Sequence, residues 1–197
     1  MTSPSPSIES LRAGDPQALE SLFQLHSDRV YRLALGLLRE RQAAEDVVQE
    51  TFLSAMTHLD RFEGRSSLGT WLYRVAYNAS LTRLRERPTE PLPPDEPEAG
   101  EPPVPRALVE WDLTPEEMLM DSEARRHLDA AIAALPASLR AAFILRDVEE
   151  LSTLETADTL GISEGAVKVR LHRARLALRE HLAEYFGKRA ARKEGEK

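Results

Sequence analysis

Five basic side chains and no acidic one lie between Ala166 and Arg179, in a chain of 197 residues whose formal net charge is −7. They are Lys168, Arg170, Arg173, Arg175 and Arg179. Lysine and arginine at this density can neutralise phosphates, which is the chemistry of binding a nucleic-acid backbone. The alternative is the solvated polar face of an ordinary surface helix. The surrounding pattern has to decide between them.

The apolar residues of this segment share one narrow stripe of a helical wheel, which must face a core. They are Val167, Leu171, Ala174 and Leu178. Some residues point away from this stripe and others flank it. This arrangement suits a helix whose outer face enters a major groove while its flanking side chains reach the phosphates. We predict a duplex-DNA-binding set of Lys168, Val169, Arg170, His172, Arg173 and Arg175.

A second basic cluster lies between Arg65 and Arg87, with five arginines and one acid. Arg74, Asn78 and Arg85 fall on one helical stripe, with Tyr77 beside it. Arginine can neutralise phosphate, and asparagine can hydrogen-bond a base edge. Trp71 is either a stacking platform for a base or a core residue.

The segment "AEDVVQETFL" has a third pattern. One side of a helix carries acidic and amide groups with a single apolar residue, which suits a basic partner surface; the alternative is a solvated helix face. The side chains concerned are Asp46, Gln49, Glu50 and Leu53.

Three helices are expected to position the second and third clusters. Asp15 is a predicted N-cap and Pro16 the first residue of a helix, because both residue types favour these positions. Apolar spacing of three and four predicts further helices over 42–59 and 67–87, joined by the loop "DRFEGRSS". The N-terminal part is therefore predicted to be all helical.

The first basic cluster belongs to a predicted helix-turn-helix. A capping box at Thr114 and Glu117 starts a helix that ends near Ala134. Three more helices follow, and the last two are separated only by Gly161, Ile162 and Ser163. A short helix, a glycine-containing turn and a longer helix are typical of this motif, with Gly161 in the left-handed conformation and Ser163 as the N-cap.

The acidity of the chain is concentrated between the two helical parts. Residues 88–123 have a net charge of −10, against 0 before them and +3 after them. Prolines and repelling carboxylates keep such a segment extended. We predict two small helical domains joined by a flexible acidic linker, with these divisions: a flexible N-terminus 1–14, a domain 15–87, the linker 88–113, a domain 114–186 and a basic tail 187–197.

Two long segments resemble bacterial RNA polymerase sigma factors. "LPASLRAAFILRDVEELSTLETADTLGISEGAVKVRLHRARLALREHL" resembles their region 4, and "AAEDVVQETFLSAMTHLDRFEGRSSLGTWLYRVAYNASLTRLR" resembles their region 2. The resemblance covers about 15–87 and 115–185. Because the extra regions of housekeeping sigma factors are missing, the chain resembles the extracytoplasmic-function (ECF) group.

This resemblance implies a promoter-specificity subunit that is not an enzyme. Region 4 would read the minus-thirty-five element as duplex, and Asp46, Gln49, Glu50 and Leu53 would dock on the clamp helices of the largest subunit of core RNA polymerase. An anti-sigma factor is a further implied partner. The melted minus-ten element would meet one more set, Arg65, Ser66, Ser67, Trp71, Arg74, Tyr77, Asn78 and Arg85.

The linker and two substitutions add open questions. The linker is either a tether or a polyanionic segment that occupies the RNA exit path, as the resemblance suggests. Thr156 replaces a branched aliphatic residue of the family pattern, and Val169 replaces a common serine. The second change favours apolar contact, for example with a thymine methyl, over hydrogen bonding.

Composition excludes several other functions. The chain has no cysteine, and no second ligand stands near His172 at zinc spacing, so no metal and no cofactor are expected. No export signal or apolar run of roughly 18 residues is present, so we expect a cytoplasmic protein that is not embedded in a membrane. Two alternatives remain: a stand-alone helix-turn-helix regulator, and a helical adaptor that binds only protein. An enzyme is the poorest fit, because no phosphate-binding glycine loop or nucleophile motif is found.

Overall fold

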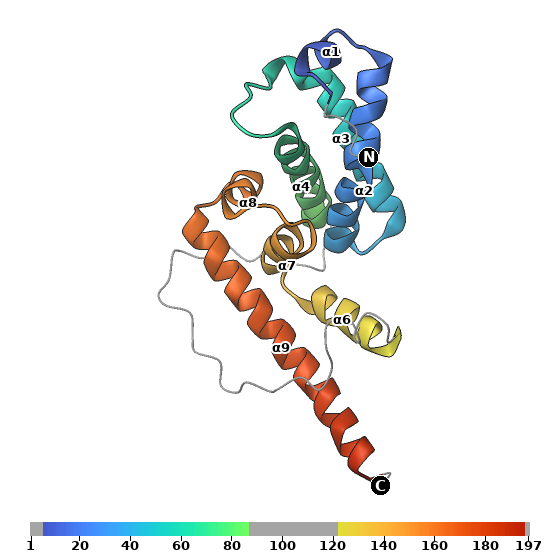
Figure 1. Cartoon of the computed structure of the whole chain (residues 1–197), viewed down its shortest axis with the longest axis vertical. Coiled ribbons are helices and arrows are strands. Elements are labelled where there is room, and N and C mark those ends of the chain that lie inside the picture. The colour runs from blue at the N-terminus through green and yellow to red at the C-terminus, as the bar shows by residue number, and fades with distance from the viewer. Residues whose placement is uncertain (1–5, 87–121, 196–197) are drawn as a thin grey trace.

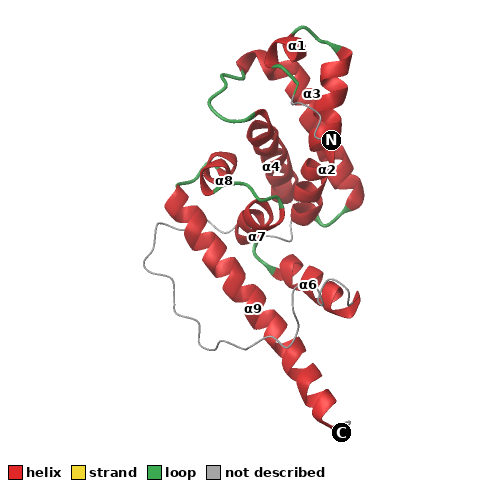
Figure 2. Cartoon of the chain, in the orientation of Figure 1, coloured by secondary structure: helices red, strands yellow, loops and turns green. Residues whose placement is uncertain are grey.

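A computed structural model describes residues 6–86 and 122–195, and every regular element in these ranges is a helix (Figures 1 and 2). The all-helical class is thus confirmed. The predicted linker 88–113 and the predicted helix start at Thr114 lie outside the described residues. The elements are α1 (Ile8–Arg12), α2 (Pro16–Leu38), α3 (Arg41–His58), η1 (Leu59–Arg61), α4 (Leu68–Glu86), α6 (Ser122–Ala134), α7 (Ala137–Phe143), η2 (Ile144–Val148), α8 (Thr153–Leu160) and α9 (Glu164–Gly195).

Local capping chemistry sets several of these boundaries. The Asp15 side chain accepts a hydrogen bond from the backbone N–H of Gln17 at 3.1 Å, as a helix N-cap does. Ser152 and Glu155 form a reciprocal capping box at the start of α8. Gly161 ends α8 with φ of 68°, and the Ser163 hydroxyl accepts from Ala166 N at 3.1 Å. The predicted helix-turn-helix is confirmed, with both predicted turn residues in their roles.

The N-terminal region is a bundle of α2, α3 and α4, which pack against one another (Figure 1). The sequence predicted a flexible segment over 1–14, of which the structure describes residues 6–14. Residues 8–12 form α1, which Ser7 caps and whose Leu11 is buried. Burial of one leucine against the bundle gives this short helix a reason to stay in place.

The C-terminal region is built on the long helix α9, against which α6, α7 and α8 pack. Its inner stripe is the predicted one: Val167, Leu171, Ala174 and Leu178 are all buried. A small separate cluster joins α6 to the far half of α9 through Ala131, Leu135, Leu178 and Leu182, among others. The helix continues to Gly195, so the described part of the predicted basic tail extends it.

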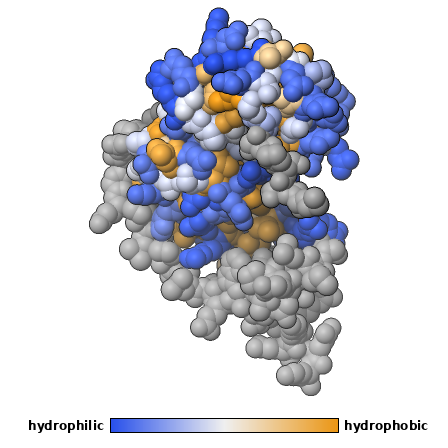
Figure 3. Space-filling model, turned by 45° about the horizontal axis from the view of Figure 1, so that its top comes forward, coloured by the Kyte–Doolittle hydropathy of each residue, from blue (hydrophilic) through white to orange (hydrophobic). Residues whose placement is uncertain are grey.

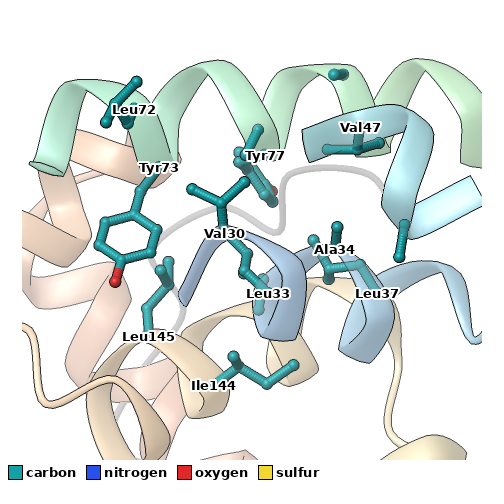
Figure 4. Packing of buried hydrophobic residues seen from close by; sticks show 14 of the residues in the cluster. Val30, Leu33, Ala34, Leu37, Val47, Leu72, Tyr73, Tyr77, Ile144 and Leu145 are labelled. Carbon is teal, nitrogen blue, oxygen red and sulfur yellow. The ribbon is translucent and has the colours of Figure 1, made fainter. Parts of the chain in front are cut away.

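One large apolar core spans both regions. Ile144 and Leu145 of the C-terminal region lie among Val30 and Leu33 of α2 and Tyr73 of α4 (Figure 4). The α7 and α8 helices therefore lie beside α2 and α4 in Figure 1, and contacts between these elements agree. The two helical regions that the sequence predicts are packed together through a shared interior.

Candidate nucleic-acid interface

The helix α9 presents the predicted duplex-binding residues on its outer side. Lys168 and Arg175 are exposed, and the remaining four of the set are half-buried: Val169, Arg170, His172 and Arg173. The buried stripe fixes the rotation of the helix, and the six side chains lie outside that stripe. Nε2 of His172 is nevertheless buried and has no hydrogen-bond partner among the described residues. The geometry is that of a recognition helix that follows a tight turn.

Arg175 has a structural partner in the same region. Its guanidinium binds the Asp147 carboxylate through two hydrogen bonds, Nε to Oδ2 at 2.8 Å and NH2 to Oδ1 at 2.6 Å. The hydrogen bond to Asp147 raises the pKa of Arg175 above its usual value. Two parallel hydrogen bonds hold the Arg175 guanidinium in a fixed orientation. The exposed Arg175 therefore also links α9 to η2.

The helix α4 divides its predicted residues between surface and core. Arg74, Asn78 and Arg85 are exposed and occupy one face. Tyr77 is buried, and the ring of Trp71 packs against Phe62 with centroids 5.6 Å apart. Trp71 is half-buried and packs against the core cluster.

The loop before α4 carries the other predicted contacts. The Ser67 hydroxyl accepts from Thr70 N at 3.0 Å, so Ser67 caps the helix. Arg65 forms an exposed ion pair with Glu63, and Ser66 is half-buried. Gly64 has φ of 70°, a conformation that costs glycine little. The loop therefore presents Arg65 to solvent and uses Ser67 to hold the helix start.

The predicted acidic face of α3 is assembled as expected. Asp46, Gln49, Glu50 and Leu53 are all exposed, and Leu53 is 60% accessible. Glu50 also binds Arg83 of α4 at 2.6 Å, which ties this face to the neighbouring helix.

Met56 is a member of the α3 face that the sequence analysis missed. It lies one turn after Leu53 and is 52% accessible. The three-residue spacing from Leu53 was the available signal. In Figure 3, apolar side chains form patches between polar ones on the surface. The exposed apolar side chains of α2 include Phe23, whose ring centroid lies 4.9 Å from that of Phe52 on α3.

A hollow lies between α4 and the helix-turn-helix. It is lined by Arg74 and Asn78 on one side and by residues 157–163 on the other. Arg74 Nε donates to the backbone oxygen of Asp158 at 2.7 Å. The α4 face predicted to contact DNA therefore lies against α8 and the turn that precedes α9, a contact that the sequence did not indicate.

The described residues give no sign of a metal centre or a membrane helix. Within 6–86 and 122–195, no three acidic, histidine or cysteine side chains are grouped so as to hold a metal ion. In the same ranges, none of the helices combines the length and the apolar character that crossing a membrane requires.

Comparisons with known proteins match both regions in order. Sigma-70 region 2 matches residues 22–88, and sigma-70 region 4 matches residues 125–178. The ECF RNA polymerase sigma factor SigW of Bacillus subtilis is 31% identical over 89% of this chain and 94% of its own length. The sigma factor SigE of Mycolicibacterium smegmatis is 37% identical over 90% of this chain and 67% of its own.

Two solved structures share the fold. CnrH in complex with the cytosolic domain of CnrY has a TM-score of 0.65 and 22% identity, covering 90% of this chain and 95% of that chain. The sigma factor RpoE in complex with the anti-sigma factor NepR, from Bartonella quintana, has a TM-score of 0.61 and 28% identity, covering 83% and 96%.

Proposed function

The chain belongs to the ECF group of RNA polymerase sigma factors, and from this premise we propose how it reads a promoter. As a sigma factor it is not an enzyme but associates with RNA polymerase and directs promoter-specific initiation of transcription. We infer that α9 reads the minus-thirty-five element as duplex, and that α4 with its preceding loop binds the melted minus-ten strand. Transcription initiation takes place in the cytoplasm, where RNA polymerase acts.

The duplex reading by α9 is carried by the helix-turn-helix geometry. Val169, His172 and Arg173 are half-buried beside the exposed Lys168 and Arg175. We propose that they enter a major groove, where arginine recognises guanine and an apolar group contacts the thymine methyl. Lys168 reaches a phosphate. Arg170 and Arg175 complete the flanks, and Asp147 orients Arg175.

The minus-ten reading by α4 is supported by its exposed Arg74, Asn78 and Arg85. Opening a base step costs a few kcal/mol, which contacts to the extruded base and its phosphates must recover. Arg65 and Ser66 of the loop would join them. Trp71 is half-buried and Tyr77 is buried, so we propose that these two aromatics shape the surface from beneath.

The acidic and apolar face of α3 is proposed to dock on core polymerase, on the clamp helices of its largest subunit. Asp46, Gln49 and Glu50 supply the charge and hydrogen bonds for a basic partner, and Leu53 with Met56 supplies exposed apolar area. An anti-sigma factor is also proposed as a partner, because the similar RpoE was solved with the anti-sigma factor NepR. We further propose functional domains over 15–87 and 114–186.

Run-off transcription tests the proposed function. Purified core polymerase would transcribe a promoter library with and without the protein. Initiation that depends on the protein, at a shared two-part sequence, is the expected result. If the protein binds duplex sites alone and core polymerase gains no start sites, the chain acts as a stand-alone regulator and the α4 assignments fail.

A further inference from the structure

The Glu149 carboxylate is a buried acid that no predicted binding set uses. It is 1% exposed and lies in the C-terminal region, directly after η2. Both of its oxygens accept from arginines of α2: Arg29 Nε donates at 3.0 Å, and Arg32 donates through Nε at 2.6 Å and NH2 at 2.9 Å. The Tyr73 hydroxyl of α4 donates at 3.4 Å.

All these donors belong to the other helical region, so the Glu149 cluster joins the two regions. A buried carboxylate needs such partners, because an unpaired charge in the interior is strongly disfavoured. Arg29 and Arg32 keep about half of their side-chain surface exposed, so water can solvate them if the regions separate. The buried carboxylate of Glu149 therefore needs the two arginines more than they need it.

A second buried group extends the same contact. Arg140 of α7 is fully buried and donates from NH1 to the backbone oxygens of Gly36 and Leu37, each at 3.2 Å. These oxygens lie in the last turn of α2, where helical carbonyls need donors. Gly36 also lets Ile144 approach, since a Cβ at residue 36 would lie 2.3 Å from Ile144 Cδ1.

The joined regions cover the α4 face. Arg74 donates a hydrogen bond to the backbone oxygen of Asp158. Asn78 lines the hollow between α4, α8 and the turn that follows α8. Elements named for positions ten and thirty-five lie about 25 base pairs apart, which is ~85 Å of duplex at 3.4 Å per pair. Because α8 packs on both α4 and α9, it holds these two helices close together, and in this arrangement they cannot reach two elements that far apart.

The chain length between the regions allows them to separate that far. Residues 87–121 comprise 35 residues, which span at most about 120 Å when fully extended. The arrangement in the structure and the arrangement on a promoter must therefore be two different states, if the proposed function holds.

We propose that Glu149 is a latch that holds the free chain closed, with α8 covering the nucleic-acid face of α4. Reading a promoter then requires the carboxylate to leave Arg29 and Arg32. The covering of α4 as an inhibitory contact rests on the proposed function, whereas the latch itself does not.

Charge reversal at Glu149 and a wedge at Gly36 test the latch from opposite sides. Glu149→Lys places a cation against two arginines. Gly36→Leu forces Ile144 away while keeping a good helix former in α2. Glu150→Lys is the matched control, because it changes the net charge equally at the next residue, whose side chain is exposed. Far-UV circular dichroism first confirms that each variant keeps its helix content.

Distances between spin labels in the free, full-length protein report closure. The chain has no cysteine, so Arg41→Cys on α3 and Glu180→Cys on α9, both exposed, give one clean label pair. A single narrow distance distribution is expected without further change and with Glu150→Lys. A longer, broader one is expected with Glu149→Lys and with Gly36→Leu. Unchanged distances in both latch variants overturn the latch.

Binding of a fluorescent, random-sequence single-stranded DNA 12-mer pool reports the uncovering of α4. Opening should tighten binding about fivefold or more, because a closed population lowers apparent affinity by the fraction that is competent. Glu150→Lys corrects for added charge, and Asn78→Ala should remove the gain. Longer distances without tighter binding overturn the covering of α4; run-off transcription then judges the proposed function separately.

Discussion

Arg74 has two possible partners for one guanidinium. In the structure it donates to the carbonyl of Asp158, a neutral acceptor. A phosphate would be the stronger partner, because it carries the opposite charge and can accept two parallel N–H bonds from one guanidinium. Exchange of a backbone carbonyl for a phosphate is thus favourable once the helices separate.

Substitution of Arg173 tests the base-reading face of α9. Arg173→Ala should weaken binding to a promoter duplex by about 1–3 kcal/mol, because a bidentate arginine contact to guanine is worth that much in discrimination. Fluorescence anisotropy of the holoenzyme on promoter DNA measures it. Arg125→Ala, an exposed arginine on α6, is the control. Equal losses in the two variants would contradict the assignment.

Asn78→Ala addresses strand opening separately from binding. We expect the closed promoter complex to form nearly as before, because Asn78 carries no charge, while the melted complex loses a base-edge hydrogen bond of about 1 kcal/mol. Permanganate reactivity of unpaired thymines measures opening, and filter binding measures the closed complex. An equal effect on both steps would show that Asn78 does not recognise the melted strand.

Single side chains were only partly predictable from the sequence. The helical wheel predicted the exposure of Arg74, Asn78 and Arg85 because their positions repeat every turn. It could not decide whether Trp71 faces a base or a core, since that depends on Phe62 in a loop before the helix. Thr156 is buried without loss, because its hydroxyl donates to Ser152 O at 2.9 Å.

The helix-turn-helix owes its shape to short-range chemistry, which is why its boundaries were predictable. Gly161 and Ser163 both act within four residues along the chain. The same is true of Asp15 at the start of α2. By contrast, η2 continues α7 with wider hydrogen bonding up to Val148. No local residue pattern predicted that change, which places Glu149 beneath α2.

Glycine at residue 161 tests how far the turn depends on backbone conformation. Gly161→Ala should lower the free energy of unfolding by about 1–2 kcal/mol, because a side chain disfavours the left-handed conformation seen there. Gly165→Ala is the control: it lies in α9 with no close neighbour, so it should stabilise by up to about 1 kcal/mol. Urea unfolding measures both. A neutral Gly161→Ala would mean that the turn relaxes.

His26 makes the contact between α2 and α4 sensitive to acid. Its Nδ1 is buried without a hydrogen-bond partner among the described residues, and its ring abuts Gly69. Burial, and then the charge of Arg29, lower the pKa of His26. Above pH 6.5 both folded and unfolded forms are neutral; below it, the unfolded chain takes up a proton that the folded chain resists.

Stability should therefore fall as the pH drops from about 6.5 toward the lowered pKa of His26, at up to ~1.4 kcal/mol per pH unit. Urea unfolding at a series of pH values measures this slope. His26→Gln should flatten it, and the exposed His181→Gln should leave it unchanged. A slope identical in all three proteins would exclude His26 as its source.

The shared core should make the two regions unfold together. Calorimetry is expected to give one transition with matching calorimetric and van't Hoff enthalpies, since the main apolar cluster draws side chains from both regions. Glu149→Lys should split this transition into two, because each region then unfolds independently of the other. Two transitions in the unmodified protein would show that the regions are energetically independent.

This packing is the part of the structure that the sequence predicted least. Two helical regions and their order were readable from periodicity, capping residues and the acidic block between them. Their association depends on pairs such as Arg32 and Glu149, which are 117 positions apart. Contacts between residues so far apart in the chain produce no repeating pattern in the sequence. The sequence around Glu149 does not distinguish it from an exposed glutamate.

The burial of Ile144 and Leu145 has a consequence for turnover of the protein. When the chain opens, these side chains lose their cover, and exposed apolar surface and loosened backbone are what proteases attack. Cleavage follows the population of the open form when opening is fast. A free, closed molecule should therefore outlive an open one that lacks a partner, so that closure sets its lifetime in the cell as well as its activity.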